Sequence, residues 1–276
     1  MENINNILDQ ARANEGVNMT PEVYAKCLSL IDLTSLNSTD TVEKITDMTD
    51  KVNSFKTTFP KYKQVAAICV YPNFAATVKG NLKDQEVKIA VVGGVFPSSQ
   101  SFLEVKVAEC KMAVEQGANE VDIVLSLNHF FSNQDELAAD EISKIKKAIG
   151  TAHLKVILES GSIKEPEKIY KAAMLAMDAG ADFIKTSTGK TEPAATSEAA
   201  AVMCSAILDY YNKTGRKVGF KPAGGISTPE DAVKYFSIVQ TILGDQWLHS
   251  SLFRIGASRL ANKLLSKLEN RSINYF

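Results

Sequence analysis

Short apolar runs rich in β-branched residues alternate along the chain with stretches whose apolar residues follow helical spacing. The short runs predict eight strands, at residues 31–34, 65–71, 87–92, 121–125, 154–159, 183–186, 218–221 and 252–255. The stretches between them predict helices, for example at residues 102–116, 167–179, 197–211 and 229–242. From about residue 31 onward, strand and helix therefore alternate without interruption.

This alternation predicts the fold class. Apolar strands joined by helical crossovers indicate a parallel sheet whose faces are covered by helices. Eight such units without a linker predict an α/β fold of the closed (β/α)8 type, the TIM barrel. We expect one barrel domain over residues 1–276, with residues 1–30 forming an N-terminal helical segment that caps the barrel. A doubly wound open sheet is the alternative architecture.

Composition narrows the functional classes. The 276 residues carry 31 Lys and Arg against 32 Asp and Glu, so the net charge of −1 favours neither nucleic acid nor a membrane surface as a partner. The polar start of the chain resembles no secretory leader, and we expect a cytoplasmic protein. The four cysteines are far apart and form no CxxC pair, which predicts reduced thiols rather than disulfides or a zinc site.

A weak internal repeat places an acid and a lysine at equivalent positions. The segments GANEVD at residues 117–122 and GADFIK at residues 180–185 share a glycine, a short turn and the start of a strand. Asp122 and Lys185 therefore lie on the fourth and sixth predicted strands. Because alternate strands of a barrel contribute side chains to the same interior layer, the two side chains are expected at one level.

A second lysine ends the next predicted strand, in VGFKPAGG at residues 218–225. Strand alternation turns Val218 and Phe220 toward the helices and Lys221 toward the barrel axis. A single strand-end lysine usually extends to water. Two of them on neighbouring strands are harder to explain by structure alone, because buried lysine requires a partner.

Two inward lysines and an aspartate fit Schiff-base chemistry. Ammonium groups about 5 to 6 Å apart repel by about 3 kcal/mol at an effective dielectric constant near 20, which is about two pKa units. Lys185 or Lys221 is then neutral near pH 7, as attack on a carbonyl requires. Asp122 supplies a group that relays protons.

Glycine-rich loops follow the last three predicted strands and contain Gly189, the pair Gly224 and Gly225, and Gly256. Barrels often bind phosphate at the loops after their last strands, where backbone N–H groups and a helix N-terminus face the anion. The expected ligand is a small phosphate ester.

The two lysine segments, DFIKTSTGK at residues 182–190 and VGFKPAGG, resemble the signature stretches of the deoxyribose-phosphate aldolases, class I aldolases with a (β/α)8 fold. Supporting matches, in chain order, are IDLT at 31–34, AICVYP at 67–72, NEVD at 119–122 and FRIGAS at 253–258. The resemblance implies reversible cleavage of 2-deoxy-D-ribose 5-phosphate to D-glyceraldehyde 3-phosphate and acetaldehyde. It also implies that no metal or other cofactor is used, that the partners are small sugar phosphates and aldehydes, and that the protein is a homodimer.

The resemblance also implies roles for individual residues. Lys185 would form the Schiff base, Lys221 would lower its pKa, and Asp122 would relay protons. The implied substrate-binding residues are Asp32, Thr34, Cys69, Thr188, Gly189 and Lys190. The expected phosphate-binding residues are Gly224, Gly225, Ser227, Gly256, Ala257, Ser258 and Arg259. Among these, the backbone N–H groups of Gly224, Gly225, Gly256 and Ala257 are expected to carry most of the recognition.

Three positions depart from the family pattern. Ser227 stands where many members have arginine, and Arg259 stands where a second serine commonly follows the last strand. We expect Arg259 to restore the charge that Ser227 lacks. Many relatives end in a tyrosine implicated in proton abstraction, whereas here Tyr275 is followed by Phe276. The sequence is compatible with Tyr275 inside or outside the site.

Two other functions fit part of the pattern. One is a Schiff-base barrel acting on a longer sugar phosphate, such as a transaldolase-like enzyme, and the other is a non-catalytic sugar-phosphate sensor. A sensor would be expected to lack Lys185, Lys221 or Asp122, and all three are present. A metal-dependent aldolase is disfavoured because the histidines have no metal-ligand spacing.

Overall fold

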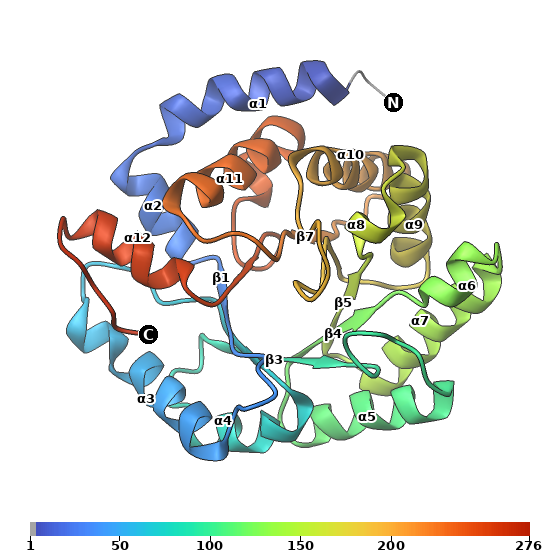
Figure 1. Ribbon diagram of the computed structural model, residues 1–276, viewed down its shortest axis with the longest axis horizontal. Helices are drawn as coiled ribbons and strands as arrows, with labels where there is room; N and C mark the ends of the chain where they lie inside the picture. Colours follow the sequence, from blue (N-terminus) through green and yellow to red (C-terminus); the bar gives the residue numbers. More distant parts are fainter. Residues whose placement is uncertain (1–3) are drawn as a thin grey trace.

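The structure is a computed structural model that describes residues 4–276, and it contains an eight-stranded parallel sheet surrounded by helices (Figure 1). The strands are β1 Ile31–Thr34, β2 Ala67–Val70, β3 Lys88–Gly93, β4 Glu120–Val124, β5 His153–Ile157, β6 Phe183–Lys185, β7 Gly219–Lys221 and β8 Ile255–Ala257. Seven of them coincide closely with the predicted runs. The eighth prediction, at 252–255, was wrong in register, because residues 252–254 precede the paired strand and only Ile255 belongs to it.

Helices connect successive strands. The α-helices are α1 Ile4–Asn18, α2 Pro21–Leu28, α3 Val42–Thr58, α4 Ala75–Asn81, α5 Leu103–Glu115, α6 Leu127–Phe131, α7 Asp135–Ile149, α8 Ser160–Ile163, α9 Pro166–Asp178, α10 Ser197–Thr214, α11 Pro229–Leu243 and α12 Leu260–Leu268, and the short 3-10 helices are η1 Pro72–Phe74 and η2 Asp245–Trp247. Threonine side chains cap the N-termini of α2, α3, α10 and α11. Among residues 4–276, no helix is long and apolar enough to cross a bilayer.

The sheet closes on itself as a barrel. Its strand order is β7-β6-β5-β4-β3-β2-β1-β8, so seven of the eight junctions are regular parallel pairs. The eighth junction joins β7 to the approach to β8 through single bridges between Phe220 and Phe253 and between Ala223 and Gly256. Its backbone hydrogen bonds run from Arg254 N to Phe220 O and from Gly256 N to Pro222 O. The closed barrel confirms the predicted fold class.

The N-terminal helices lie on the outside of the barrel. Helix α1 packs against α11 and α10, and α2 packs against α12 and α11 (Figure 1). The buried face of α1 contains Ile7, Leu8 and Ala11. The described part of the segment thus adds a layer to the side of the barrel, whereas the sequence placed it as a cap. Residues 1–3 lie outside the described part of the chain.

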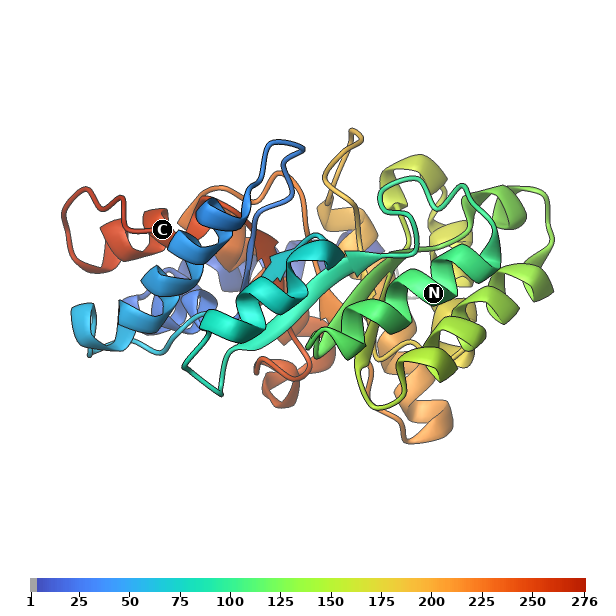
Figure 2. The same cartoon turned by 90° about the horizontal axis from the view of Figure 1, so that it is seen from below.

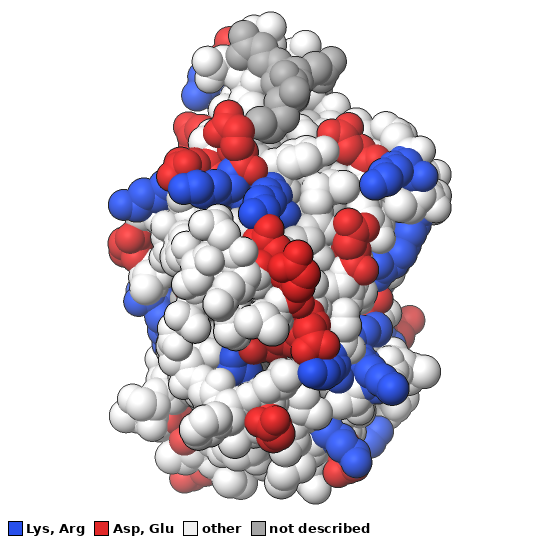
Figure 3. Space-filling model, turned by 90° about the vertical axis from the view of Figure 1, so that its right-hand side faces the viewer, with Lys and Arg blue, Asp and Glu red and all other residues white. Residues whose placement is uncertain are grey.

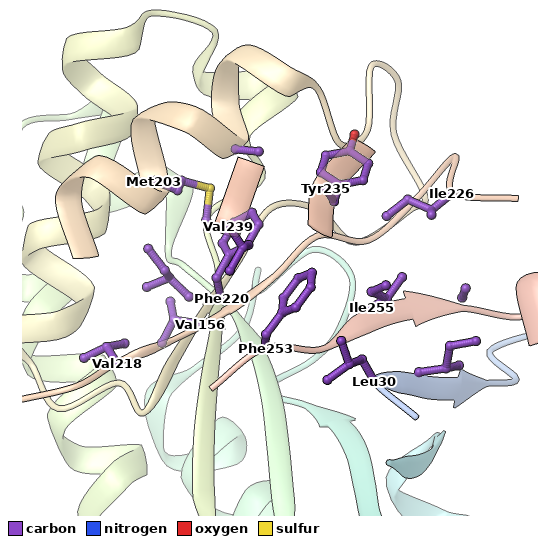
Figure 4. Close-up of a cluster of buried hydrophobic side chains, with 14 of the residues drawn as sticks. Leu30, Val156, Met203, Val218, Phe220, Ile226, Tyr235, Val239, Phe253 and Ile255 are labelled. Carbon is purple, nitrogen blue, oxygen red and sulfur yellow. The ribbon is translucent and has the colours of Figure 1, made fainter. Parts of the chain in front are cut away.

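Apolar side chains fill the layer between the strands and the outer helices. Figure 4 shows Val218, which precedes β7, and Phe220 of β7 on the side of Met203 of α10 and Val239 of α11. All four are buried. Because successive strand residues face opposite sides, this packing turns Gly219 and Lys221 into the barrel, as predicted.

The loops that follow the strands gather at one end of the barrel. In Figure 2, the loops after β1 and β6 rise on the same side of the molecule. A hydrogen bond from Lys190 Nζ to the Leu36 carbonyl oxygen joins these two loops at 2.6 Å. This end of the barrel contains the site described next, as is general for this architecture.

Candidate active site

Strands β4, β6 and β7 bring Asp122, Lys185 and Lys221 together inside the barrel. Lys185 and Lys221 are register partners on adjacent strands. The Asp122 Oδ2 atom lies 3.0 Å from Lys185 Nζ and 2.7 Å from Lys221 Nζ. The amino groups of Lys185 and Lys221 therefore lie close together, because both contact the same oxygen atom. All three side chains are buried.

The environment of Lys185 favours a neutral amine. Burial lowers the pKa of Lys185, and the positive charge of Lys221 lowers it further, whereas Asp122 acts in the opposite direction. The net pKa of Lys185 lies below its ordinary value. The sequence predicted this direction from charge repulsion alone. The structure shows that burial is the larger cause.

Lys221 and Asp122 are both held in their charged forms. Burial lowers the pKa of Lys221, but the carboxylates of Asp122 and Asp32 outweigh it, so the pKa is raised. Burial likewise raises the pKa of Asp122, and the lysines around it outweigh that effect and hold the pKa well below its usual range. Lys221 is thus an ammonium donor and Asp122 a carboxylate acceptor.

A second set of buried charges lies beneath these residues, and the sequence reasoning missed three of its four members. The set consists of Asp32 on β1, Glu120 on β4, Lys155 on β5 and Arg254 before β8. Lys155 Nζ lies 2.6 Å from Glu120 Oε2 and 2.9 Å from Asp122 Oδ1. The Arg254 guanidinium lies 2.7 Å from Glu120 and 2.6 Å from Asp32. Lys221 also contacts Asp32 Oδ2, at 2.5 Å.

The sequence contains a signal for two members of this second set, Glu120 and Lys155. Glu120 lies two residues before Asp122, so strand alternation turns both toward the barrel interior. Lys155 is the register partner of Asp122 on the neighbouring strand and interrupts an apolar run. A charged residue in such a run predicts a buried partner, because charges are rarely buried unpaired.

The charges in the barrel interior balance without Lys185. Three carboxylates, from Asp32, Glu120 and Asp122, are opposed by three cations. These cations remain charged although they are buried. These cations belong to Lys155, Lys221 and Arg254, whose pKa values are all raised. Lys185 is the fourth basic side chain, and its carboxylate partner is the oxygen of Asp122 that Lys221 already holds. Charge balance and burial therefore both favour the neutral form of Lys185.

A cavity of about 370 Å³ opens above Lys185 at the end of the barrel to which the loops project. Lys185 is the member of the buried charge cluster that lines it. The predicted substrate- and phosphate-binding residues that also line it are Thr34, Thr188, Gly189, Lys190, Gly224, Gly225, Ser227, Gly256, Ala257, Ser258 and Arg259. Leu36 and Asn37, which the sequence reasoning did not select, complete the wall next to β1.

Two of the predicted substrate-binding residues do not reach the cavity. Asp32 is fully buried and lies in the ion cluster below it. Cys69 is fully buried on β2 among Leu36, Ala90 and Val92. Burial raises the pKa of the Cys69 thiol, so it remains protonated. These two side chains support the floor of the site from beneath.

The loop after β6 is held by a buried carboxylate. Glu159, which follows β5, accepts hydrogen bonds from the Thr188 backbone N–H at 3.1 Å and from its hydroxyl at 2.6 Å. The hydroxyl oxygen of Thr188 in turn accepts a bond from the Lys190 backbone N–H at 3.0 Å. Glu159 thereby fixes one wall of the cavity, a role that the sequence reasoning did not assign.

The glycine loops contribute to the cavity in different ways. Gly224 and Gly225 have φ angles of 86° and 75°, and a side chain at Gly224 would lie 2.6 Å from the Cβ of Ala194. Glycine is therefore required for this turn. The expectation for Gly256 was wrong with respect to its backbone group, because the Gly256 N–H donates to Pro222 O in the barrel closure.

The two helices that begin next to the cavity, α11 and α12, differ in how their N-termini are capped. The Ser227 and Thr228 N–H groups donate to the Asp231 carboxylate, which together with Thr228 caps α11. The Arg259 side chain makes no capping hydrogen bond at the start of α12, and the first turn of α12 contains no acidic residue. Helix α12, after Ser258 and Arg259, is thus the helix start best suited to an anion.

Tyr275 lies away from the cavity. Its hydroxyl donates to the Lys51 carbonyl oxygen on α3 at 2.7 Å, and its ring packs against Phe55, Phe59 and Phe276. In this arrangement the C-terminal tyrosine anchors the end of the chain to α3.

Comparison with known proteins identifies the group to which this chain belongs. The sequence profile described as DeoC/LacD family aldolase matches residues 26–243. The chain belongs to this aldolase family. It is 41% identical to the human deoxyribose-phosphate aldolase over 254 residues, which are 87% of this chain and 78% of that protein. It is 40% identical to the deoxyribose-phosphate aldolase of Bos taurus over 250 residues, which are 85% of this chain and 77% of that protein.

A solved structure extends the comparison to the fold. The deoxyribose phosphate aldolase from Aeropyrum pernix, described as a unique tetramer, superposes with a TM-score of 0.72 at 26% identity. The superposition covers 95% of this chain and 96% of that one. The protein described here is therefore an aldolase, a carbon–carbon lyase, with a barrel fold shared by its relatives. The family profile matches this aldolase up to Leu243, the last residue of α11. Strand β8 and the loop that contains Arg259 follow the matched residues.

Proposed function

We propose that this aldolase reversibly cleaves 2-deoxy-D-ribose 5-phosphate to D-glyceraldehyde 3-phosphate and acetaldehyde through a Schiff base on Lys185. The observation that carries the proposal is the shared Asp122 oxygen, which holds Lys185 and Lys221 together at the floor of the cavity. Relatives named deoxyribose-phosphate aldolase over most of the chain support the choice of substrate.

Lys185 is the proposed nucleophile. Its neutral amine attacks the aldehyde carbon of the open-chain sugar and forms a carbinolamine, which loses water to give a protonated imine. The lowered pKa of Lys185 increases the fraction of neutral amine at physiological pH. Because Lys185 lines the cavity, a substrate bound there lies next to it.

Lys221 and Asp122 are the proposed proton-transfer pair. Loss of water from the carbinolamine requires a proton donor, and the Lys221 ammonium lies on the same carboxylate oxygen as Lys185. In the cleavage step the bond between C2 and C3 breaks, its electron pair moves to the imine to form an enamine, and the proton of the C3 hydroxyl passes to the relay formed by Asp122. Protonation of the enamine at C2 and hydrolysis by water release acetaldehyde and restore the free Lys185 amine.

The phosphate is proposed to bind at the far wall of the cavity. Gly224 and Gly225 on one side and Ser258 and Arg259 on the other line this wall. The uncapped start of α12 supports an anion there, because its backbone N–H groups and the helix dipole favour negative charge. Arg259 would add a formal positive charge. The hydroxyls of Ser227 and Ser258 are proposed as further donors.

The remaining lining residues are proposed to hold the sugar between the two ends. Thr188 and Lys190 project from the loop after β6, and Thr34 lies at the end of β1. The bond between Lys190 and the Leu36 carbonyl oxygen draws these two loops together. The cavity volume of about 370 Å³ lies within the usual range for small-molecule sites, which suits a sugar phosphate.

We further propose a cytoplasmic homodimer without a nucleic-acid or membrane partner. The four cysteines are free and buried, which supports a reducing compartment. On the face shown in Figure 3, basic side chains are interspersed with acidic ones. Exposed apolar side chains on and beside α5, those of Phe102, Val105 and Met112, support self-association. Light scattering of the purified protein tests the dimer, and a monomer or a tetramer would contradict it.

Product analysis tests the proposed reaction. Wild-type protein supplied with 2-deoxyribose 5-phosphate should release acetaldehyde and glyceraldehyde 3-phosphate in equal amounts. Lys185→Leu should release neither, whereas Lys217→Leu, which changes an exposed lysine near the start of β7, should retain full activity. Release of a three-carbon ketone fragment from a longer ketose phosphate instead would favour the transaldolase-like alternative.

A further inference from the structure

The two oxygens of the Asp122 carboxylate have different partners in the buried ion cluster. Oδ2 receives Lys221 and Lys185, of which Lys185 lines the cavity, and Oδ1 receives Lys155 at 2.9 Å. Lys155 is the register partner of Asp122 on β5, so the backbone of the sheet fixes this approach. Lys155 thereby determines which oxygen Asp122 presents to the reactive lysines.

Lys155 itself has no access to substrate. It is fully buried and does not line the cavity. Its ammonium group lies 2.6 Å from Glu120 Oε2 and 3.7 Å from Asp32 Oδ2, in addition to its contact with Asp122. Three carboxylates thus surround one cation. Any effect of Lys155 on the reaction must pass through these neighbours.

The charge of Lys155 completes the balance beneath Lys185. If Lys155 is removed, the carboxylates of Asp32, Glu120 and Asp122 are opposed by Lys221 and Arg254 only. The excess negative charge would favour a protonated Lys185, because an uncompensated buried carboxylate attracts the nearest proton. A protonated amine cannot attack a carbonyl.

We propose that Lys155 is a positioning residue of the aldolase site, which orients the Asp122 carboxylate and keeps the buried ion cluster neutral while Lys185 is uncharged. The proposal rests on the proposed function in one respect, namely that Lys185 is the Schiff-base lysine. It adds a third buried lysine to Lys185 and Lys221, one that acts on the reaction only through Asp122 and the charge balance of the cluster.

Charged or titratable groups on several strands face Lys155 or its carboxylate partners, and any pH dependence must take them into account. They are Asp32 on β1, Cys69 on β2, Glu120 and Asp122 on β4, His153 on β5, Lys185 on β6, Lys221 on β7 and Arg254 before β8. The His153 ring lies 3.9 Å from Glu120 and is half-exposed. The measurements below are therefore repeated in a His153→Gln background.

The first test compares Lys155→Met with Lys106→Met. Lys106 is an equally buried lysine, paired with Glu141 at 2.8 Å in the helix layer, so its replacement controls for loss of a buried ion pair elsewhere. The readout is the pH at which Lys185 becomes reactive, measured by trapping its imine with acetaldehyde and cyanoborohydride. We expect Lys155→Met to move this pH upward by about one unit, and Lys155→Arg and Lys106→Met to leave it unchanged.

The second test uses charge compensation. Glu120→Gln removes one carboxylate and should move the pH at which Lys185 becomes reactive downward, opposite to Lys155→Met. The double variant Glu120→Gln, Lys155→Met restores the balance and should return it to within a few tenths of the wild-type value. A merely structural role for Lys155 would not produce shifts of opposite sign that cancel.

These outcomes separate this inference from the proposed function. If the wild-type adduct is not on Lys185, the proposed function fails. If the adduct is on Lys185 but the pH of reactivity is the same in all folded variants, only the role of Lys155 is overturned. Should Lys155→Met not fold, Glu120→Gln and the double variant still decide, because equal pH values for these two and the wild type would contradict the proposal.

Discussion

Lys185 and Lys221 are register partners on β6 and β7, and their amino groups approach the same oxygen of one buried aspartate. Their environments nevertheless differ. Lys221 has a second carboxylate, Asp32, at 2.5 Å, whereas Lys185 faces the cavity. Asp122 and Asp32 together raise the pKa of Lys221, whereas burial and the charge of Lys221 leave the pKa of Lys185 lowered. One lysine is suited to donate protons and the other to act as a nucleophile.

Replacement of Lys221 tests this division of roles. Lys221→Leu removes a positive charge next to Lys185 and leaves Asp122 and Asp32 with less compensation, and both changes raise the pKa of Lys185. The rise of kcat/KM with pH should then occur about one to two pH units higher than in the wild type. The activity at the optimum should also fall, because a proton donor is lost.

A pH–rate profile provides this measurement, with Lys217→Leu as the control for an exposed lysine on the same segment. A lower rate with an unshifted acidic limb would show that Lys221 acts in proton transfer alone and does not set the pKa of Lys185.

Replacement of Arg259 tests the phosphate end of the cavity. A charge-assisted hydrogen bond contributes about 1.5 to 3 kcal/mol, so Arg259→Ala should reduce the preference for 2-deoxyribose 5-phosphate over 2-deoxyribose by roughly ten- to over a hundredfold. Cleavage of the unphosphorylated sugar serves as the internal control and should not change. An unaltered ratio would place Arg259 outside the phosphate site and leave recognition to the backbone and serine groups.

Replacement of Glu159 tests the support of the loop after β6. Glu159→Ala leaves the two buried donors of Thr188 without their acceptor, which should lower the free energy of unfolding by about 1 to 3 kcal/mol. KM should rise, because Thr188, Gly189 and Lys190 line the cavity. Urea denaturation and steady-state kinetics measure the two effects.

The control for this prediction is Glu165→Ala, which removes an exposed carboxylate paired only with Lys168 at the start of α9 and should cost less than about 1 kcal/mol. Equal destabilisation by the two substitutions would mean that the contact between Glu159 and Thr188 contributes nothing specific.

The sequence predicted the barrel well because its strands are buried on both faces and therefore appear as short, mostly apolar runs. It failed at β8, where Leu252 and Phe253 are apolar for a different reason. These residues pack beside Phe220 at the barrel closure before regular pairing begins at Ile255. Apolar periodicity records burial and not hydrogen-bond register, so it could not separate the two segments.

The candidate site was predictable where strand alternation applied and less so elsewhere. Lys185 and Lys221 followed from their positions at strand ends, and Asp122 followed from its equivalence to Lys185 in the internal repeat. Lys155 and Glu120 obey the same rule, but their role depends on the partner that each meets across the barrel. Two features depend on contacts between distant segments, which a single sequence does not specify. The Gly256 N–H donates a hydrogen bond in the barrel closure, and Tyr275 docks on α3.

The most direct test of the central claim is the location of the trapped substrate fragment. Wild-type protein is incubated with acetaldehyde and sodium borohydride, digested, and mapped by mass spectrometry. We expect one added two-carbon unit on Lys185 within residues 183–190, at a rate that falls as pH drops below the pKa of that lysine, and no adduct in Lys185→Leu. An adduct on Lys221 would reverse the assigned roles, and the absence of any adduct under conditions of active turnover would contradict the Schiff-base mechanism.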